Sequence, residues 1–180
     1  MAKKLPQIIN REEYEKLFLS IDKVKYISKK KLQQYKLAIL LAGEAGMRIS
    51  EIVGYKGKNT IEPLNKSQIE NASIRINQGK GKKDRIVPRP KRMNEKAIAM
   101  LPLKIQRRAL QHFTTKLALE VLGKHITFHT LRHYFGSQCA DKMPLHQVQM
   151  LMGHSRLDTT GIYLHANPAK AVENAREVFG

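Results

Sequence analysis

Residues 151–163 of the chain read LMGHSRLDTTGIY, and this segment ends on the phenol of Tyr163. Pro144 is a typical residue for the start of a helix and Gly153 for its end, so a helix is expected over 144–153. Ser155 and Asp158 then form a capping-box pattern that predicts a further helix carrying Tyr163. The segment therefore predicts two helices joined by a short turn, with His154 in the turn.

A second informative segment, residues 129–133, reads HTLRH within a helix expected over 127–141. His129 and Arg132 share one helix face, and a guanidinium can hold two phosphate oxygens at once. Taken alone, the pair fits a solvated arginine beside a buried histidine at least as well. His129 and His133 have the spacing of zinc-protease helices, but Thr130 replaces the glutamate of those helices and no third ligand follows. No metal site is therefore expected.

The charge of the chain indicates a polyanionic partner. Its 180 residues include 33 Lys and Arg but only 15 Asp and Glu, a formal net charge of +18. Such an excess attracts phosphate backbones, which favours double-stranded DNA over a membrane surface but does not separate an enzyme from a passive binder. The single cysteine, Cys139, excludes an intrachain disulfide and fits a cytoplasmic setting. The best apolar run, 37–42, is far shorter than the ~20 residues that span a bilayer.

The rest of the chain is expected to be mainly α-helical with one small antiparallel sheet, an α+β fold. Asn10 and Glu13 form a capping box for a first helix to about 21, and Ser28 is expected to cap a second that ends between Gly43 and Gly46. Alternation over 72–77 predicts a strand that pairs with a strand over 85–88 in a hairpin. Further helices are expected over 49–53, 94–101, 107–122 and 168–179, with a loop over 54–66.

The tip of this hairpin, residues 79–84, reads GKGKKD. Lys80 lies between two glycines and could reach into a DNA groove, where it could contact a base edge or give a proton to a departing hydroxyl. It could equally belong to a flexible tip that only attracts DNA. Lys82 and Lys83 are close enough to compete for either role.

Arg48 and Tyr163 complete the set of candidates. Glu51 is placed to orient the Arg48 guanidinium toward a phosphate, although an ordinary surface pair of little energy is the alternative. A free phenol has a pKa of ~10, so Tyr163 as a nucleophile needs a histidine to accept its proton and guanidiniums to favour its phenolate. Tyr163 could otherwise be a packing residue.

The complete ordered set resembles the catalytic domain of the tyrosine recombinases, the phage integrase family, over about 5–179. Arg48 in MRISEI resembles the first catalytic arginine of the family, and Lys80 in GKGKKDR its hairpin lysine. His129 and Arg132 resemble its second motif, His154 in LMGHS its third, and Tyr163 its nucleophile. Glu51 and His133 are expected to support this site.

The resemblance implies site-specific DNA recombination or integration through a 3′-phosphotyrosyl intermediate, without metal, ATP or other cofactor. Tyr163 is expected to attack the phosphodiester, His129 to accept its proton and Lys80 to protonate the leaving oxygen. Arg48, Arg132 and His154 are expected to stabilise the phosphate charge. Relatives also imply a tetramer on DNA formed through 168–180. Further DNA contacts are expected from five cations: Lys56, Lys58, Lys82, Lys83 and Arg85.

Two departures from the family pattern remain. Residues 1–180 are expected to form a single catalytic domain, without the core-binding domain that normally precedes it in the family. An extra loop occupies about 55–62, with Lys56 and Lys58 available to DNA. Two alternatives stay open: a non-catalytic DNA-binding module of the same fold, and a type IB topoisomerase-like enzyme that swivels one duplex without joining two.

Overall fold

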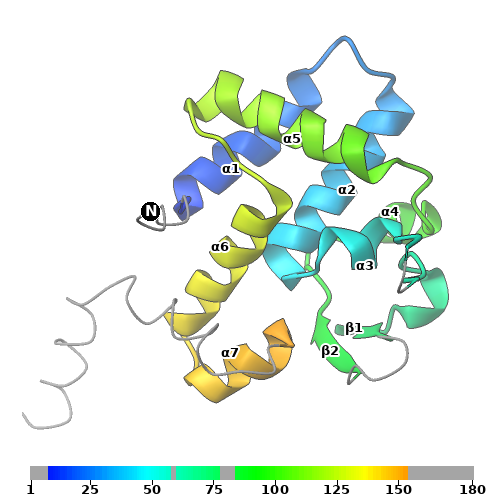
Figure 1. Ribbon diagram of the computed structural model, residues 1–180, viewed down its shortest axis with the longest axis vertical. Coiled ribbons are helices and arrows are strands. Elements are labelled where there is room, and N and C mark those ends of the chain that lie inside the picture. The colour runs from blue at the N-terminus through cyan, green and yellow to red at the C-terminus, as the bar shows by residue number, and fades with distance from the viewer. Residues whose placement is uncertain (1–7, 58–59, 78–83, 154–180) are drawn as a thin grey trace, which may run out of the picture.

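The computed structural model in Figure 1 describes residues 8–57, 60–77 and 84–153 of the chain. Most of these residues are helical and two short strands form one antiparallel sheet, which confirms the predicted fold class. The elements in chain order are α1 (Arg11–Ser20), η1 (Ile21–Lys23), α2 (Lys29–Ala45), α3 (Ile49–Val53), η2 (Lys66–Gln68), β1 (Ser73–Ile76), β2 (Arg85–Pro88), α4 (Glu95–Ala99), α5 (Arg107–Leu122), α6 (Phe128–Ala140) and α7 (Leu145–Met152).

The predicted capping box starts α1. The side chain of Asn10 accepts from the Glu13 amide at 2.8 Å, and the Glu13 carboxylate accepts from the Asn10 amide at 3.0 Å. Ser28 is the N-cap residue of α2, as expected, although its side chain makes no capping hydrogen bond. Helix α2 continues past Gly43 to Ala45 and has Gly46 as its C-cap, as predicted, while Gly43 lets the Tyr14 ring pack against the helix. A Cβ on Gly43 would lie 2.4 Å from that ring.

Helix α2 forms the centre of the core. Its apolar run over 37–42 is buried on every side, as expected of a helix with apolar residues all round. Helix α5 lies across α1 and α2 at one end of the molecule, while α6, α7 and the sheet lie at the other end (Figure 1). Helix α2 packs against α6, and α7 packs against β2. The C-terminal ends of α2 and α7 are thereby brought to the same region as the start of α3.

The two strands pair as the alternation predicts. Ile74 lies opposite Val87, and both side chains are buried, as is that of Ile76. The alternate residues Arg75 and Ile86 are exposed, so one sheet face covers the core and the other faces outward. In the described part of the 54–66 loop, Tyr55 and Ile61 exchange two backbone hydrogen bonds of 2.8 Å and form an isolated bridge. Within the described ranges, no helix has both the length and the apolar character needed to cross a bilayer.

Candidate active site

Arg48 lies at the N-cap of α3, where Glu51 holds it from the first turn of the same helix. The backbone amide of Arg48 donates to Glu51 Oε2 at 2.7 Å, and Nη1 donates to Oε1 at 2.9 Å. The Arg48 side chain is 37% exposed, whereas that of Glu51 is 4% exposed. The buried Glu51 carboxylate therefore orients the Arg48 guanidinium, as the sequence predicted for this pair. Part of the Arg48 side chain still faces solvent.

Glu51 also forms a buried bidentate ion pair with Arg85 of β2. Arg85 Nη1 and Nη2 donate to the two carboxylate oxygens at 2.8 Å each. Burial disfavours the charged form of Glu51, but the hydrogen bonds and charge of Arg85, with a smaller contribution from Arg48, outweigh it and lower the pKa to about 2. The carboxylate is therefore ionised at all ordinary pH values. Arg85 was expected to contact DNA, but in the described structure its side chain is only 6% exposed and is paired with Glu51.

Arg132 of α6 is buried. Its guanidinium donates to the carbonyl oxygen of Gly46, which ends α2, and to that of Met152, the last residue of α7. The side chain thus ties three helices together at the site. In a buried position a guanidinium acts through a lower effective dielectric, so its attraction for a phosphate is stronger than at an exposed surface.

Three arginines meet at the C-terminal end of α7. Arg85 Nε donates to the carbonyl oxygen of Leu151 at 2.9 Å, Arg132 donates to that of Met152, and Arg48 Nη2 donates to that of Gly153 at 3.4 Å. The last carbonyls of a helix have no partner within the helix and carry the negative end of its dipole, so cations are favoured there. Three consecutive carbonyls accept from β2, α6 and the start of α3. This arrangement brings the predicted Arg48 and Arg132 together and places both beside the peptide that leads to position 154.

His129 and His133 interact with each other on α6. Their Nε2 atoms lie 2.7 Å apart and their rings meet edge to face, with centroids 4.2 Å apart. One Nε2 must donate and the other accept, so the contact holds a single proton. Desolvation, then the charges of Arg132 and Arg48, lowers the pKa of His129. Burial, with His129 and Arg132, lowers that of His133 to about 4. Both rings are therefore neutral at pH 7, the state in which His129 could accept a proton.

Several predicted site residues lie outside the described residues. These are the three catalytic candidates Lys80, His154 and Tyr163 and the three DNA-contact candidates Lys58, Lys82 and Lys83. Lys56 is described and exposed. Of the predicted catalytic residues, the structure therefore describes Arg48, His129 and Arg132. In the described part of the chain, no three His, Cys, Asp or Glu side chains gather in an arrangement that could hold a metal ion.

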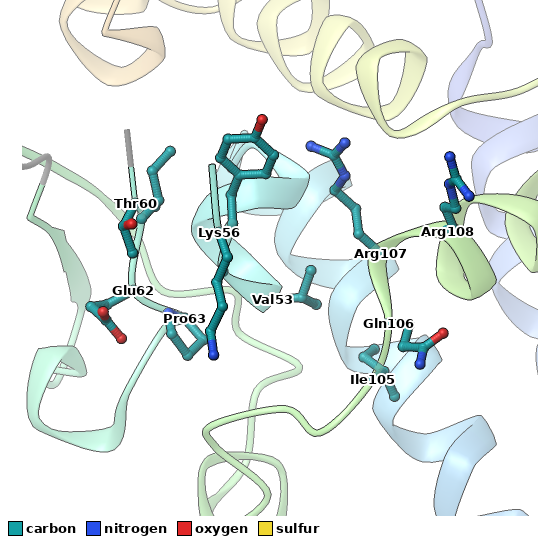
Figure 2. Close-up of a pocket in the computed structure, with 12 residues that line it drawn as sticks. Val53, Lys56, Thr60, Glu62, Pro63, Ile105, Gln106, Arg107 and Arg108 are labelled. Carbon is teal, nitrogen blue, oxygen red and sulfur yellow. The ribbon is translucent and has the colours of Figure 1, made fainter. Parts of the chain in front are cut away.

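A basic cleft lies beyond the other end of α3, where the sequence indicated Lys56 as a DNA contact but did not indicate Arg107 and Arg108. It has a volume of about 510 Å³ and lies between the 53–63 segment and the start of α5. Figure 2 shows Arg107 and Arg108 projecting to the same side of the cleft, while Lys56 runs in the opposite direction. The Arg107 guanidinium lies over the Tyr55 ring, 5.0 Å from its centroid. Two adjacent arginines at the start of a long helix could have indicated this cleft from the sequence. Their position near Tyr55 depends on the tertiary fold.

Comparison with known proteins identifies relatives of this chain by sequence. The sequence profile of the phage integrase family matches residues 102–170. Tyrosine recombinase XerA of Thermococcus onnurineus is 30% identical over 201 residues, which cover 100% of this chain and 66% of that protein. A tyrosine recombinase of Pseudothermotoga lettingae is 32% identical over 161 residues, which cover 81% of this chain and 54% of the relative. The chain thus spans between about half and two thirds of the length of these relatives.

Solved structures agree with the sequence relatives. The XerH site-specific recombinase bound to a palindromic difH substrate, in a post-cleavage complex, superposes with a TM-score of 0.69 at 28% identity. That match covers 96% of this chain and 53% of the XerH chain. The XerA recombinase has a TM-score of 0.70 at 19% identity, covering 98% of this chain and 66% of the XerA chain, and supports the shared fold.

Proposed function

The chain belongs to the phage integrase family of tyrosine recombinases, and from this membership we propose that it cuts and rejoins duplex DNA through a 3′-phosphotyrosyl intermediate at Tyr163. The observation that carries the proposal is the meeting of Arg48 and Arg132 at the end of α7. Two guanidiniums in one pocket suit a phosphodiester, because each can stabilise the charge that builds on the non-bridging oxygens.

In the proposed reaction, the Tyr163 oxygen attacks the scissile phosphorus and the bond to the 5′-oxygen breaks. His129 accepts the phenolic proton, and Lys80 gives a proton to the departing 5′-oxygen. A 5′-hydroxyl, from the same or a partner duplex, then attacks the phosphotyrosine and releases the tyrosine. One phosphodiester is exchanged for another of similar energy, so the exchange needs no nucleotide hydrolysis. His154 joins Arg48 and Arg132 in stabilising the transferring phosphate.

The other tyrosines of the chain are poorly suited to the role of nucleophile. Tyr14 and Tyr35 are buried in the core, and burial raises the pKa of Tyr14 and of the buried Tyr134. A phenol with a raised pKa is less able to form the phenolate that attacks phosphorus. Tyr26 and Tyr55 are exposed, but Lys116 and Arg107 lie over their rings. This distribution supports Tyr163 as the nucleophile.

Double-stranded DNA is the proposed partner, and the basic cleft extends its binding surface. The cleft follows α3, whose other end carries Arg48, and a five-residue helix rises by only about 7.5 Å. Because each DNA strand carries a phosphate every ~3.4 Å along the axis, a backbone held at Arg48 also has phosphates at this distance. Arg107 and Arg108 are therefore proposed to contact the flanking backbone. Assembly of a tetramer through 168–180 stays a prediction, since that segment lies outside the described residues.

One experiment separates this proposal from its two alternatives. The chain is incubated with a library of nicked duplexes of random sequence and with supercoiled plasmid, in the presence of a chelator, and protein-linked DNA is collected under denaturing conditions. The proposal predicts an adduct on a 3′ end together with joined products. An absence of adduct supports a non-catalytic DNA-binding module, and adduct with relaxed plasmid but no joined products supports a topoisomerase-like enzyme. The captured duplex then serves as the substrate for the tests below.

A further inference from the structure

Arg85 has contacts that its position in the hairpin does not explain. It follows the lysine-rich tip closely, yet its guanidinium points inward and makes three hydrogen bonds, two to Glu51 and one to the carbonyl of Leu151. The residue is only 8% exposed, and each of its three guanidinium nitrogens donates to Glu51 or to the Leu151 carbonyl. Arg85 is therefore expected to act on the site through Glu51 and the Leu151 carbonyl.

We propose that Arg85 is a positioning residue that neutralises Glu51 and thereby leaves Arg48 with a net positive charge for the scissile phosphate. This inference rests on the proposed function. Arg48 carries one positive charge and Glu51 one negative charge, so the two alone form a neutral pair. With Arg85 the trio carries one net positive charge, and the phosphate meets a cationic group in place of a neutralised one.

The hydrogen-bond geometry supports these two roles, in which Arg85 neutralises Glu51 and Arg48 binds the phosphate. Glu51 Oε1 accepts from Arg48 Nη1 at 2.9 Å and from Arg85 Nη1 at 2.8 Å. Oε2 accepts from the Arg48 amide at 2.7 Å and from Arg85 Nη2 at 2.8 Å. Each oxygen is thus shared between the two arginines. Arg85 takes one bond on each oxygen, and the Arg48 guanidinium donates to Oε1 through Nη1.

Arg85 also fixes the end of α7, where the other half of the pocket is built. Its Nε donates to the Leu151 carbonyl, two residues before the carbonyl that accepts from Arg48. Gly153 packs directly on the Arg85 side chain, since a Cβ at that position would lie 2.8 Å from Cδ. Among the described residues, Arg85 from β2 and Arg48 from the start of α3 form ion pairs with Glu51, while α7 presents the Leu151 carbonyl to Arg85.

The test is a charge-compensation experiment under single-turnover conditions with saturating DNA. Arg85→Met removes the neutralising charge and is expected to slow adduct formation about tenfold or more, a smaller effect than the loss of a direct transition-state donor. The double variant Arg85→Met/Glu51→Gln removes both buried charges and restores the net charge of Arg48. It is expected to cleave faster than Arg85→Met, because the charge on the phosphate-binding group is the same again, although Glu51→Gln also weakens the orientation of Arg48.

The pH dependence gives a second readout that a purely structural role would not move. Without Arg85, burial of Glu51 is no longer outweighed by its strongest partner, so the pKa of the carboxyl rises. Protonation then removes the negative charge beside Arg48. The deficit of Arg85→Met relative to the parent is therefore expected to shrink as the pH falls, and the deficit of the double variant to stay flat.

A matched control uses the exposed pair of Arg75 and Glu70, in which Nη2 and Oε1 lie 2.7 Å apart. Arg75→Met and Arg75→Met/Glu70→Gln repeat the same chemistry on β1 and are expected to leave cleavage unchanged. Normal cleavage by Arg85→Met, or a folded double variant that remains as slow as the single one, overturns the inference. If the single variant does not fold, the rate of the folded double variant decides alone. A parent chain that forms no adduct instead refutes the proposed function.

Discussion

The guanidinium of Arg48 donates to the carbonyl oxygen of Gly153, although the two residues are 105 positions apart in the chain. Arg48 begins α3 and Gly153 ends α7, so this contact joins the start of one helix to the end of another. It brings a phosphate-binding candidate to the residue immediately before His154. Any change in how α7 ends should therefore reach the proposed chemistry.

Gly153→Ala should impair cleavage more than its effect on stability explains. Gly153 has φ +57°, and a Cβ there would also meet the Arg85 side chain. A non-glycine residue in this left-handed conformation costs roughly 1–2 kcal/mol by itself. Gly123→Ala is the matched control, because Gly123 has φ +65° and nothing within 4 Å of its added Cβ. Thermal unfolding and single-turnover cleavage are measured for both; an equal loss of cleavage in the two variants would argue against the link through Arg85.

Arg132→Ala should raise the barrier to cleavage by ~3 kcal/mol or more, which corresponds to a rate at least about 10²-fold lower. The change removes a transition-state donor together with the bonds to the carbonyls of Gly46 and Met152. Arg89→Ala is the control for the structural part, since Arg89 also caps a backbone carbonyl, that of Met93, at 2.9 Å. Cleavage by Arg132→Ala at a rate close to that of Arg89→Ala would remove Arg132 from the site.

The pair of His129 and His133 should make stability depend on pH between about 4 and 6.5. The pKa of His133 falls from 6.5 to about 4 on folding, so at intermediate pH the unfolded chain binds a proton that the folded chain excludes. The contribution of His133 to the free energy of unfolding is therefore fully present above pH 6.5 and is lost as the pH falls toward 4. Denaturant unfolding at pH 7.5 and pH 5 should show a smaller difference for His133→Gln. The same substitution at exposed His125 should leave the difference unchanged, and an unaltered difference in His133→Gln would contradict this account.

Arg107→Ala should weaken DNA binding by the loss of one phosphate contact. If Arg107 neutralises one phosphate, the slope of log K against log salt concentration should decrease in magnitude by ~0.9. Lys116→Ala is the control, because Lys116 lies on the same helix and also packs over an aromatic ring, that of Tyr26 at 4.7 Å. It removes the same charge at a distance from the cleft. Equal slopes for the two variants would mean that net charge alone acts, and that the cleft makes no contact.

Local sequence patterns predicted the helices and strands well, but they predicted buried contacts between distant residues poorly. The capping box at Asn10 and the alternation around Ile74 depend on neighbours within a few residues, and the structure has both. The lysine-rich tip beside Arg85 indicated an exposed side chain, whereas the structure buries it. Only the packing of α3 and α7 against β2 shows that Arg85 meets Glu51 and Leu151. Such partners are set by the tertiary fold, which short-range patterns do not contain.

In the candidate site, too, contacts between residues close in sequence could be predicted and contacts between distant residues could not. Arg48 and Glu51 are three residues apart, so their interaction could be predicted from helical spacing. The contact of Arg132 with Gly46 and the position of Arg107 over Tyr55 join distant parts of the chain and could not. The resemblance to tyrosine recombinases supplied the order of the candidate residues, while the structure adds the three-arginine end of α7.

The most direct test of the central claim is to identify the residue that becomes linked to DNA. Adduct trapped on the captured nicked duplex is digested with nuclease and trypsin and analysed by mass spectrometry. The account predicts a nucleotide attached through a 3′ phosphate to the peptide 157–170, LDTTGIYLHANPAK, whose one tyrosine is Tyr163. Tyr163→Phe should form no adduct while binding the duplex with nearly unchanged affinity. Adduct on any other tyrosine, or persistent adduct in Tyr163→Phe, would contradict the account.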